Sequence, residues 1–267
     1  MAISVAALAA QVQVNIPFPY LWRGYLERFL ARGLNPEIGL DAYSLSHFPP
    51  RVFGLVAGAF RRAGRTITLH GPFQDLAPGS LDDGVLAASR RRLRQACRYL
   101  PVFQPGALVC HLGYEARHYR WDQENWLVRA AATFKELAQL AAAHGVPVML
   151  ENVYETEPEL FLEVLNRVQA PNLMVCLDVG HLLAFGGGDF PAWLQTLGPV
   201  IGHLHLHDNH GDADAHLALG AGQVPLGEVL SFLAGRQRRP LITLEPHQEG
   251  SLTPSLECLS RLWPWTE

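Results

Sequence analysis

The sequence predicts a single α/β domain of the (β/α)8 (TIM) barrel class that spans residues 1–267. Short apolar runs alternate with longer amphipathic segments from one end of the chain to the other, which is the pattern of strands that each lead into a helix. No segment rich in Pro, Gly or Ser divides the chain. The length is also ordinary for one barrel, so we expect one domain rather than two.

The apolar runs give eight expected strands. They lie at Val12–Ile16, Glu37–Leu40, Thr66–His70, Ala107–His111, Pro147–Glu151, Leu173–Asp178, Ile201–His207 and Leu241–Glu245. The amphipathic segments predict helices at Leu21–Arg32, Val52–Arg62, Asp83–Tyr99, Glu124–His144, Glu157–Val168, Phe190–Thr196 and Leu226–Ala234. An open, doubly wound sheet is the alternative, but no GxGxxG motif follows the first strand as it does in dinucleotide-binding sheets.

Composition narrows the class of partner. Hydrophobic residues make up 49% of the chain, which is enough for a substantial core, and the formal charge is −4 with 21 basic and 25 acidic residues. Proteins that grip a phosphate backbone usually carry a clear positive field. We therefore expect a small-molecule partner rather than duplex DNA, while the oligomeric state stays open.

The cysteines and the chain start bear on the compartment. The four cysteines are widely spaced without a CxxC pair, which suggests buried thiols in a reducing compartment. The first residues have no basic region of the kind that opens a signal peptide, and no run approaches the roughly 18 apolar residues of a membrane span. We expect a soluble, cytoplasmic protein without a membrane partner.

The stretch from Val200 to Gly222 is unusually rich in histidine. His203, His205 and His207 alternate with leucines, so in a strand their imidazoles share one face. Asp214 and His216 follow shortly afterwards. Imidazole and carboxylate together suit a borderline cation such as zinc. The alternative is that some of these histidines are simply satisfied core residues.

Six consecutive predicted strands end in a potential metal ligand, and in a barrel this end carries the chemistry. In chain order the candidate ligands at and just after these ends are His70, His111, Glu151, Asp178, His181, His205, Asp214, His216 and Glu245. An acid at a strand end can instead cap the following helix. The repetition on one rim nevertheless favours a metal site.

These residues carry a resemblance to a known family. The motifs LHGPF, CHLG, LEN, LDVGH, HLHDN, DAH and TLEP occur in this order between Val12 and His247. The set resembles the xylose isomerase-like barrel superfamily, which joins endonuclease IV with sugar and sugar-phosphate isomerases and epimerases. The resemblance implies a TIM barrel with divalent metal ions, zinc being expected first and manganese or iron as alternatives, at one to three ions per chain.

The resemblance divides at the seventh strand. Epimerase-like members imply one ion held by Glu151, Asp178, His205 and Glu245, with an arginine a few residues after the histidine; six residues after His205 this chain has Gly211. Asp214 and His216 instead resemble a ligand pair of endonuclease IV, whose trinuclear site has a matching residue type at all nine candidate positions. The motif register selects His205, although the residues alone leave His203 and His207 open.

Two reactions follow from these ligand sets. The first hypothesis is hydrolysis of a small phosphoester by ions that share Glu151 and activate a water. The alternative is isomerisation or epimerisation of a sugar or sugar phosphate, in which Glu151 and Glu245 remove and return a proton and His181 binds a hydroxyl. The Asp214 and His216 pair tips the choice slightly towards hydrolysis. A metal-stabilised binding module without catalysis is a third class.

Four further side chains are candidates for substrate contact. Trp22 and Phe73 follow the first and third strands, and either can form a wall of the site. Arg117 and Arg120 lie in the long loop after the fourth strand, where they could meet an anionic group. The alternatives are helix packing for Trp22 and solvated surface charge for the arginines.

Overall fold

The computed structural model describes residues 3–236 and 239–265, and its strands close into one parallel barrel in the order β1 to β8. The strands are β1 Gln13–Pro17, β2 Asn35–Gly39, β3 Thr68–His70, β4 Leu108–His111, β5 Val148–Glu151, β6 Leu173–Asp178, β7 Ile201–Leu206 and β8 Leu241–Leu244. Each was predicted in sequence to within two residues at either end. The (β/α)8 barrel prediction is therefore confirmed.

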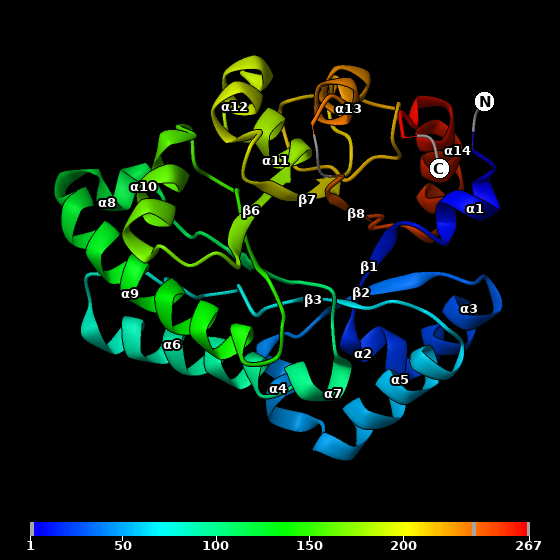
Figure 1. Cartoon of the computed structure of the whole chain (residues 1–267), viewed down its shortest axis with the longest axis horizontal. Coiled ribbons are helices and arrows are strands. Elements are labelled where there is room, and N and C mark those ends of the chain that lie inside the picture. Colours follow the sequence, from blue (N-terminus) through cyan, green and yellow to red (C-terminus); the bar gives the residue numbers. More distant parts are fainter. Residues whose placement is uncertain (1–2, 237–238, 266–267) are drawn as a thin grey trace.

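Helices surround the barrel (Figure 1). The longer ones are α5 Pro50–Arg62, α6 Asp83–Cys97, α9 Gln123–Ala142, α10 Glu159–Val168, α12 Phe190–Leu197, α13 Leu226–Ala234 and α14 Leu252–Leu262. Short helices are α1 Val5–Ala9, α2 Phe18–Tyr20, α3 Leu26–Ala31, α4 Ala42–His47, α7 Leu100–Phe103, α8 Ala116–Tyr119 and α11 Val179–Ala184. Single turns occur at η1 Leu21–Tyr25, η2 Arg120–Asp122 and η3 Glu249–Ser251.

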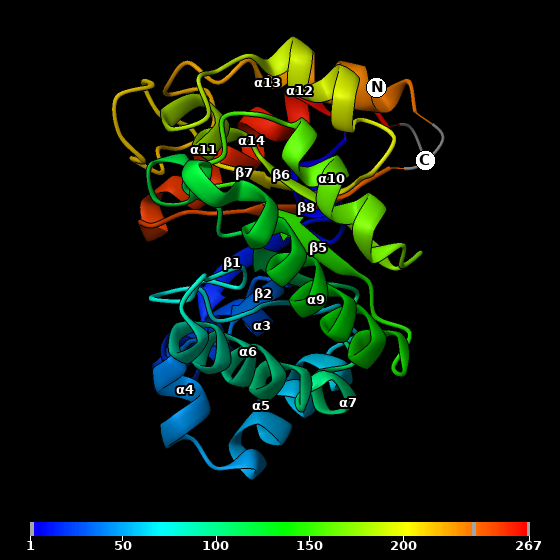
Figure 2. The same cartoon turned by 90° about the vertical axis from the view of Figure 1, so that its left-hand side faces the viewer.

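The first and last helices of the chain lie next to one another on the outside of the barrel. Helix α1 packs against α14 (Figure 1), and the view turned by 90° shows α14 in red in the upper half of the molecule (Figure 2). Helix α14 was not predicted, although its buried face is apolar. Along the described residues, no helix is both long and apolar enough to cross a membrane.

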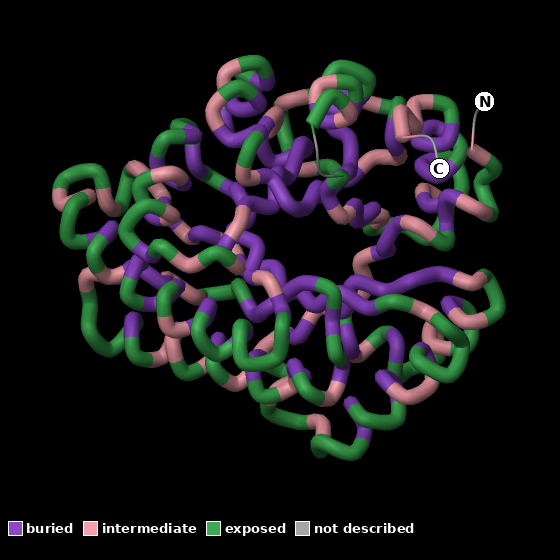
Figure 3. The backbone as a smooth tube through the Cα atoms, viewed as in Figure 1, coloured by how far each residue is buried: buried purple, intermediate pink, exposed green. Residues whose placement is uncertain are grey.

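Burial is concentrated on the strands and on the inner faces of the helices (Figure 3). Inside the barrel, Ala107, Val109, Met149 and Cys176 form a small apolar cluster. All four cysteines are free and buried, as the sequence suggests. Polar side chains occupy the barrel interior as well, and Glu37 and His203 are both fully buried.

The predicted helix at Leu21–Arg32 is not continuous, and this prediction was wrong. Residues 21–25 form a π-turn, and Gly24 inside it has a φ of 134°. This φ is accessible mainly to glycine, so the helical path breaks there and resumes in α3. Hydrophobic spacing alone does not reveal an extra residue in a turn.

Candidate metal centre

The structure brings all nine candidate ligands together at the carboxyl ends of the strands, around the carboxylate of Glu151. Its Oε2 lies 2.9 Å from Nε2 of His70 and 3.5 Å from Nε2 of His111. Its Oε1 lies 3.4 Å from Nδ1 of His205 and 3.5 Å from Nδ1 of His181. The two oxygens of one buried side chain thus face two different groups of imidazoles, as a bridging ligand would.

A second group of ligands surrounds Nδ1 of His205. This atom lies 3.0 Å from Oε1 of Glu245 and 3.9 Å from Oδ2 of Asp178. The register of the sheet explains the meeting, because Asp178 is paired with His205 across β6 and β7. Asp178 also caps α11, since Oδ1 accepts a hydrogen bond from the backbone N–H of His181 at 2.7 Å. The helix-cap interpretation and a ligand role are therefore compatible, because they use different oxygens.

A third group centres on Asp214. Its Oδ2 lies 3.2 Å from Nε2 of His216 and 3.5 Å from Nε2 of His181. The ring of His207 stacks on that of His216, with centroids 3.7 Å apart. Nε2 of His207 lies 3.0 Å from Oδ1 of Asp178. His181, His207, Asp214 and His216 each offer a ligand atom within 4.8 Å of the others.

The loop that carries Asp214 and His216 is held by a buried carboxylate. Asp208 accepts hydrogen bonds from the backbone N–H groups of Gly220, Gly222 and Val224 at 2.9, 2.9 and 3.0 Å. Residue 216 has a φ of 45°, which is uncommon for a residue other than glycine. Such a conformation persists only where the surroundings fix it.

The orientation of the imidazoles fits metal binding. His70, His181 and His216 each turn Nδ1 to a backbone carbonyl, those of Gly71, Asn152 and Glu245, at 2.8, 3.0 and 3.0 Å. A carbonyl accepts only, so each ring keeps a proton on Nδ1 and turns Nε2, the nitrogen that can bind a cation, to the carboxylates. Metal-bound histidines usually donate their second N–H in this way. Asp178 Oδ2, His205 Nδ1 and Asp214 Oδ1 are buried without a hydrogen-bond partner, which further fits a cation at this place.

The charges of the cluster are strongly coupled. Burial alone would lower the pKa of His205, but the neighbouring thiol and carboxylates, among them Glu37 and Glu245, raise it well above its ordinary value. Burial also opposes the charge of His70, yet the hydrogen bond that it donates to Glu151 raises its pKa. Burial lowers the pKa of His111 to about 4. His205 and His70 therefore tend to be protonated near neutral pH, and a bound cation would displace protons from the cluster.

Sequence reasoning did not single out Glu37 as a site residue. This fully buried side chain on β2 places Oε1 3.0 Å from Nε2 of His205, and Oε2 accepts hydrogen bonds from the hydroxyls of Thr68 and Thr243 at 2.9 and 3.0 Å. Its negative charge beside Nε2 favours a proton on that nitrogen, and Nδ1 of the same ring faces Glu151 and Glu245. The sequence feature that could have identified Glu37 is an acidic residue inside an apolar strand.

The cavity over the cluster has a volume of about 320 Å³. Phe73 lines it and stacks on His111, with ring centroids 4.4 Å apart. The described residues that line it do not include the other three predicted substrate contacts. Arg117 is paired with Glu115 on the surface, Arg120 lines a separate small pocket beside Tyr114, and Trp22 is 45% exposed in the π-turn.

Residues 37–262 match the family model of the xylose isomerase-like TIM barrel. The chain belongs to this family. Two curated relatives from Methanocaldococcus jannaschii, the uncharacterized proteins MJ1311 and MJ1614, are 31% and 26% identical over 62% and 59% of this chain. The matches span 59% and 61% of those relatives' own length.

Solved structures superpose on nearly the whole barrel. The TTHB071 protein from Thermus thermophilus, in crystals soaked with ZnCl2, is 28% identical with a TM-score of 0.81 over 94% of this chain and 97% of that one. A D-tagatose 3-epimerase-like protein is 24% identical with a TM-score of 0.79 over 94% and 96%. D-psicose 3-epimerase from Clostridium cellulolyticum H10 is 17% identical with a TM-score of 0.75 over 96% and 100%. At these lower identities the likeness establishes the fold.

Proposed function

We propose that this protein is a divalent-metal-dependent isomerase or epimerase of a small sugar or sugar phosphate. The observation that carries the proposal is the convergence of two carboxylates from β5 and from the end of β8. Glu151 and Glu245 approach the same atom, Nδ1 of His205, at 3.4 and 3.0 Å. They do so beneath a cavity whose size suits a small ligand.

The residues that would hold the ion are Glu151, Asp178, His205 and Glu245. A set of one imidazole and three carboxylates suits zinc, manganese or iron(II). When bound, a divalent ion polarises the carbonyl of a sugar and stabilises negative charge on its oxygen. Metal reconstitution is the way to distinguish the three ions, and we expect zinc first.

The chain's own residues supply the proton transfer. One of the two glutamates removes the proton from the carbon next to the carbonyl, and the other returns a proton from the opposite side, so the substrate is neither oxidised nor reduced. His181, whose Nε2 faces the cavity beside Asp214, would hold a hydroxyl group. Phe73 would cover the sugar and exclude water from one side.

Similar structures favour this reaction over phosphoester hydrolysis, the first hypothesis from the sequence. The proteins named above include a D-psicose 3-epimerase, and an E. coli protein described as a 3-keto-D-glucoside 4-epimerase is 14% identical with a TM-score of 0.73. These activities belong to those proteins. These proteins support the alternative reaction for this chain, because their names describe sugar epimerisation and their structures share its barrel fold.

The direct test is a substrate panel with metal-loaded protein. D-fructose, D-tagatose, D-psicose and their phosphates would be followed by chromatography, while p-nitrophenyl phosphate and its diester report hydrolysis. We expect new sugar isomers and no metal-dependent release of nitrophenol. Metal-dependent nitrophenol release without any sugar conversion would contradict the proposal.

Phosphoester hydrolysis remains a second candidate because His181 and His216 converge on Asp214, and His181 also lies beside Glu151. A trinuclear hydrolase needs this third group as ligands. Elemental analysis of protein purified without added metal, compared with an Asp214→Ala, His216→Ala double variant, tests it. Two or three ions that fall by one support the multinuclear site, whereas one ion that persists in the variant excludes it.

A further inference from the structure

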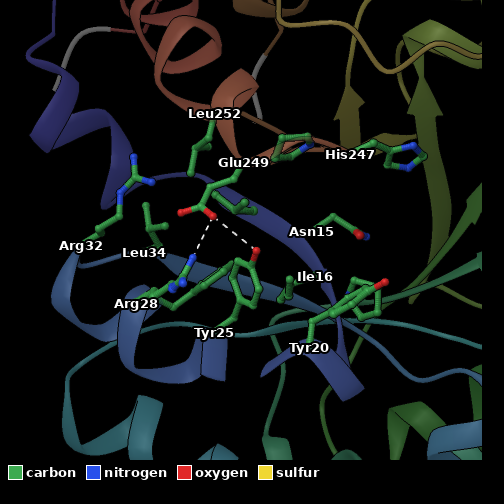
Figure 4. A pocket seen from close by; sticks show the side chains of 14 residues that line it. Asn15, Ile16, Tyr20, Tyr25, Arg28, Arg32, Leu34, His247, Glu249 and Leu252 are labelled. Atoms are coloured by element: carbon green, nitrogen blue, oxygen red, sulfur yellow. Dashed lines mark hydrogen bonds and ion pairs between the residues drawn. The ribbon is translucent and has the colours of Figure 1, made fainter. Parts of the chain in front are cut away.

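A second and larger cavity lies beside the metal centre, with a volume of about 590 Å³. Its lining includes the apolar residues Val14, Ile16 and Leu34. Tyrosine, arginine and glutamate side chains also line it (Figure 4), and we call these polar groups its rim. Nothing in the proposed reaction uses this space. It has the mixture of apolar walls and few polar groups that is typical of a ligand site.

The cavity follows from how the barrel closes. Strand β1 pairs with β8 only at Gln13 and Val14, whereas it pairs with β2 as far as Pro17. Beyond Leu244 the chain therefore diverges from β1, and the gap is walled by the π-turn, α3 and the segment around Glu249. The π-turn ends at Tyr25, whose ring lines the cavity.

The two cavities are neighbours with a common wall. Asn15, Pro17 and His247 line both of them. The ring of His247 stacks on that of His216 with centroids 3.5 Å apart, so this wall is continuous with the metal cluster. A ligand with its reacting end at Glu151 and Glu245 would extend into the second cavity past Asn15 and His247.

The rim offers both donors and acceptors. Glu249 Oε2 accepts hydrogen bonds from Arg28 at 2.8 Å and from the hydroxyl of Tyr25 at 3.3 Å, and Figure 4 shows these side chains pointing to one another. Sugar hydroxyls donate and accept, so they need such a mixed set. Tyr20 and Tyr25 add aromatic faces for the apolar side of a ring.

The same contacts argue against a phosphate group. The charge of Arg28 is already matched by Glu249, whose carboxylate would repel a second anion. Arg32 donates one hydrogen bond to the neutral hydroxyl of Thr253 at 3.2 Å, and its other N–H groups stay available to ligand hydroxyls. An uncharged, hydroxyl-rich ligand therefore fits the rim better than an anionic one.

We propose that this cavity binds a second, uncharged sugar ring, so that the substrate is a disaccharide or other glycoside whose ketose end lies at the metal centre. The proposal rests on the proposed function, because it assumes a sugar at that centre. It names the substrate class: glycosides rather than free monosaccharides or sugar phosphates.

Calorimetry on the metal-loaded protein tests this without turnover. The probes are D-fructose, its glucosides maltulose and isomaltulose, and D-fructose 6-phosphate. We expect at least one glucoside to bind about tenfold more tightly than D-fructose. Arg28→Leu and Tyr25→Ala should abolish this preference and leave D-fructose binding unchanged.

Matched controls are Arg61→Leu and Tyr43→Ala, which remove an arginine and an exposed tyrosine outside the residues that line the cavity. They should retain the preference. Equal or weaker binding of both glucosides by the wild type overturns the proposal. Tighter binding of the phosphate that is lost in Arg28→Leu also overturns it, by assigning the cavity to an anion.

Failure of this proposal and failure of the proposed function are distinguishable. A protein that isomerises D-fructose but shows no glucoside preference keeps the function and loses the subsite. A protein that converts no sugar, yet binds a glucoside through Arg28 and Tyr25, keeps the sugar-binding cavity and loses the proposed reaction.

Discussion

The two neighbouring cavities hold their polar groups in different ways. At the candidate metal centre the side chains of His205 and Glu245 are 0% and 10% exposed, and the buried carboxylate of Glu37 lies 3.0 Å from Nε2 of His205. In the second cavity Arg28 and Glu249 are 58% and 53% exposed. Buried, braced groups cost little to organise at the moment of reaction, whereas exposed groups adjust to a ligand. We therefore expect the first region to carry the chemistry and the second to select the substrate.

The largest loss of activity is expected for a change at Glu151, a buried carboxylate of the candidate metal centre. Glu151→Gln removes the carboxylate that faces both groups of imidazoles and replaces half of it with an N–H donor that repels a cation. We expect turnover to fall by about 10²–10⁴-fold and the metal content of the purified protein to fall with it. Steady-state kinetics and elemental analysis check this. Full activity in Glu151→Gln would remove the metal centre from the reaction.

A smaller loss, of metal affinity, is expected for a change at Glu37, which contacts the candidate ligand His205. Glu37→Gln removes the negative charge that holds Nε2 of His205, and we expect the metal affinity to fall by about 10–100-fold. Competition with a chromophoric chelator measures it. Glu136→Gln is the matched control, because Glu136 pairs with Arg94 on the surface at 2.8 Å. An equal affinity in the two variants would show that Glu37 has no positioning role.

The pH dependence of metal binding sharpens the same contrast. Facing carboxylates raise the pKa of His70, His181, His205 and His216 despite the opposing effect of burial. In the proposed one-ion site the histidine ligand is His205, which must lose its proton, so metal affinity should rise by about tenfold per pH unit. A multinuclear site that also uses the other three histidines would give a steeper rise. His111, with a pKa of about 4, should contribute no such dependence near neutrality. Equal affinity at about pH 6 and about pH 8 would contradict this account.

The metal-free protein should respond to pH in the opposite direction. A raised histidine pKa contributes stability that is fully present below the ordinary value of 6.5 and is lost as the pH rises through the value in the folded state. The melting temperature of the metal-free protein should therefore fall over this range, while the increase caused by added zinc should grow. Parallel changes with and without zinc would argue against a histidine cluster charged in this way.

The smallest changes in kinetics are expected for the predicted substrate contacts. They should differ between Phe73, which lines the site cavity, and Arg117, which does not. Phe73→Ala removes a ring that stacks on His111, and we expect KM to rise by about fivefold. Arg117→Ala removes an exposed side chain paired with Glu115, and we expect a change of less than about twofold. Steady-state kinetics on both variants check the contrast. A larger effect in Arg117→Ala would place the loop after β4 over the substrate.

The sequence predicted the barrel and the gathering of the candidate ligands at its rim because both depend on local pattern. Alternation places His203, His205 and His207 on one face, and all three are buried inward. Their different depths also follow, since His203 contacts Thr243 within the barrel and His207 reaches Asp214. Strand ends that carry an acid or a histidine needed no knowledge of tertiary contacts.

The features that sequence reasoning missed depend on neighbours distant in the chain. Glu37 becomes a partner of His205 only when the barrel closes β2 across from β7. The second cavity depends on the short pairing of β1 with β8 and on a π-turn whose apolar spacing resembles that of an ordinary helix. Arg117 and Arg120 were chosen by their loop, and the loop folds away from the residues that line the site cavity.

The central claim is that Glu151 and Glu245 exchange a proton with the carbon next to a sugar carbonyl. The most direct measurement is deuterium incorporation from D2O, followed by NMR, into a ketose that the metal-loaded protein converts. We expect one deuterium at the epimerised or isomerised carbon of the product, and a loss of about 10²–10⁴-fold in its rate in Glu245→Gln assayed at a metal concentration that saturates the variant. Conversion without deuterium, or unchanged exchange in both Glu151→Gln and Glu245→Gln, would contradict the account.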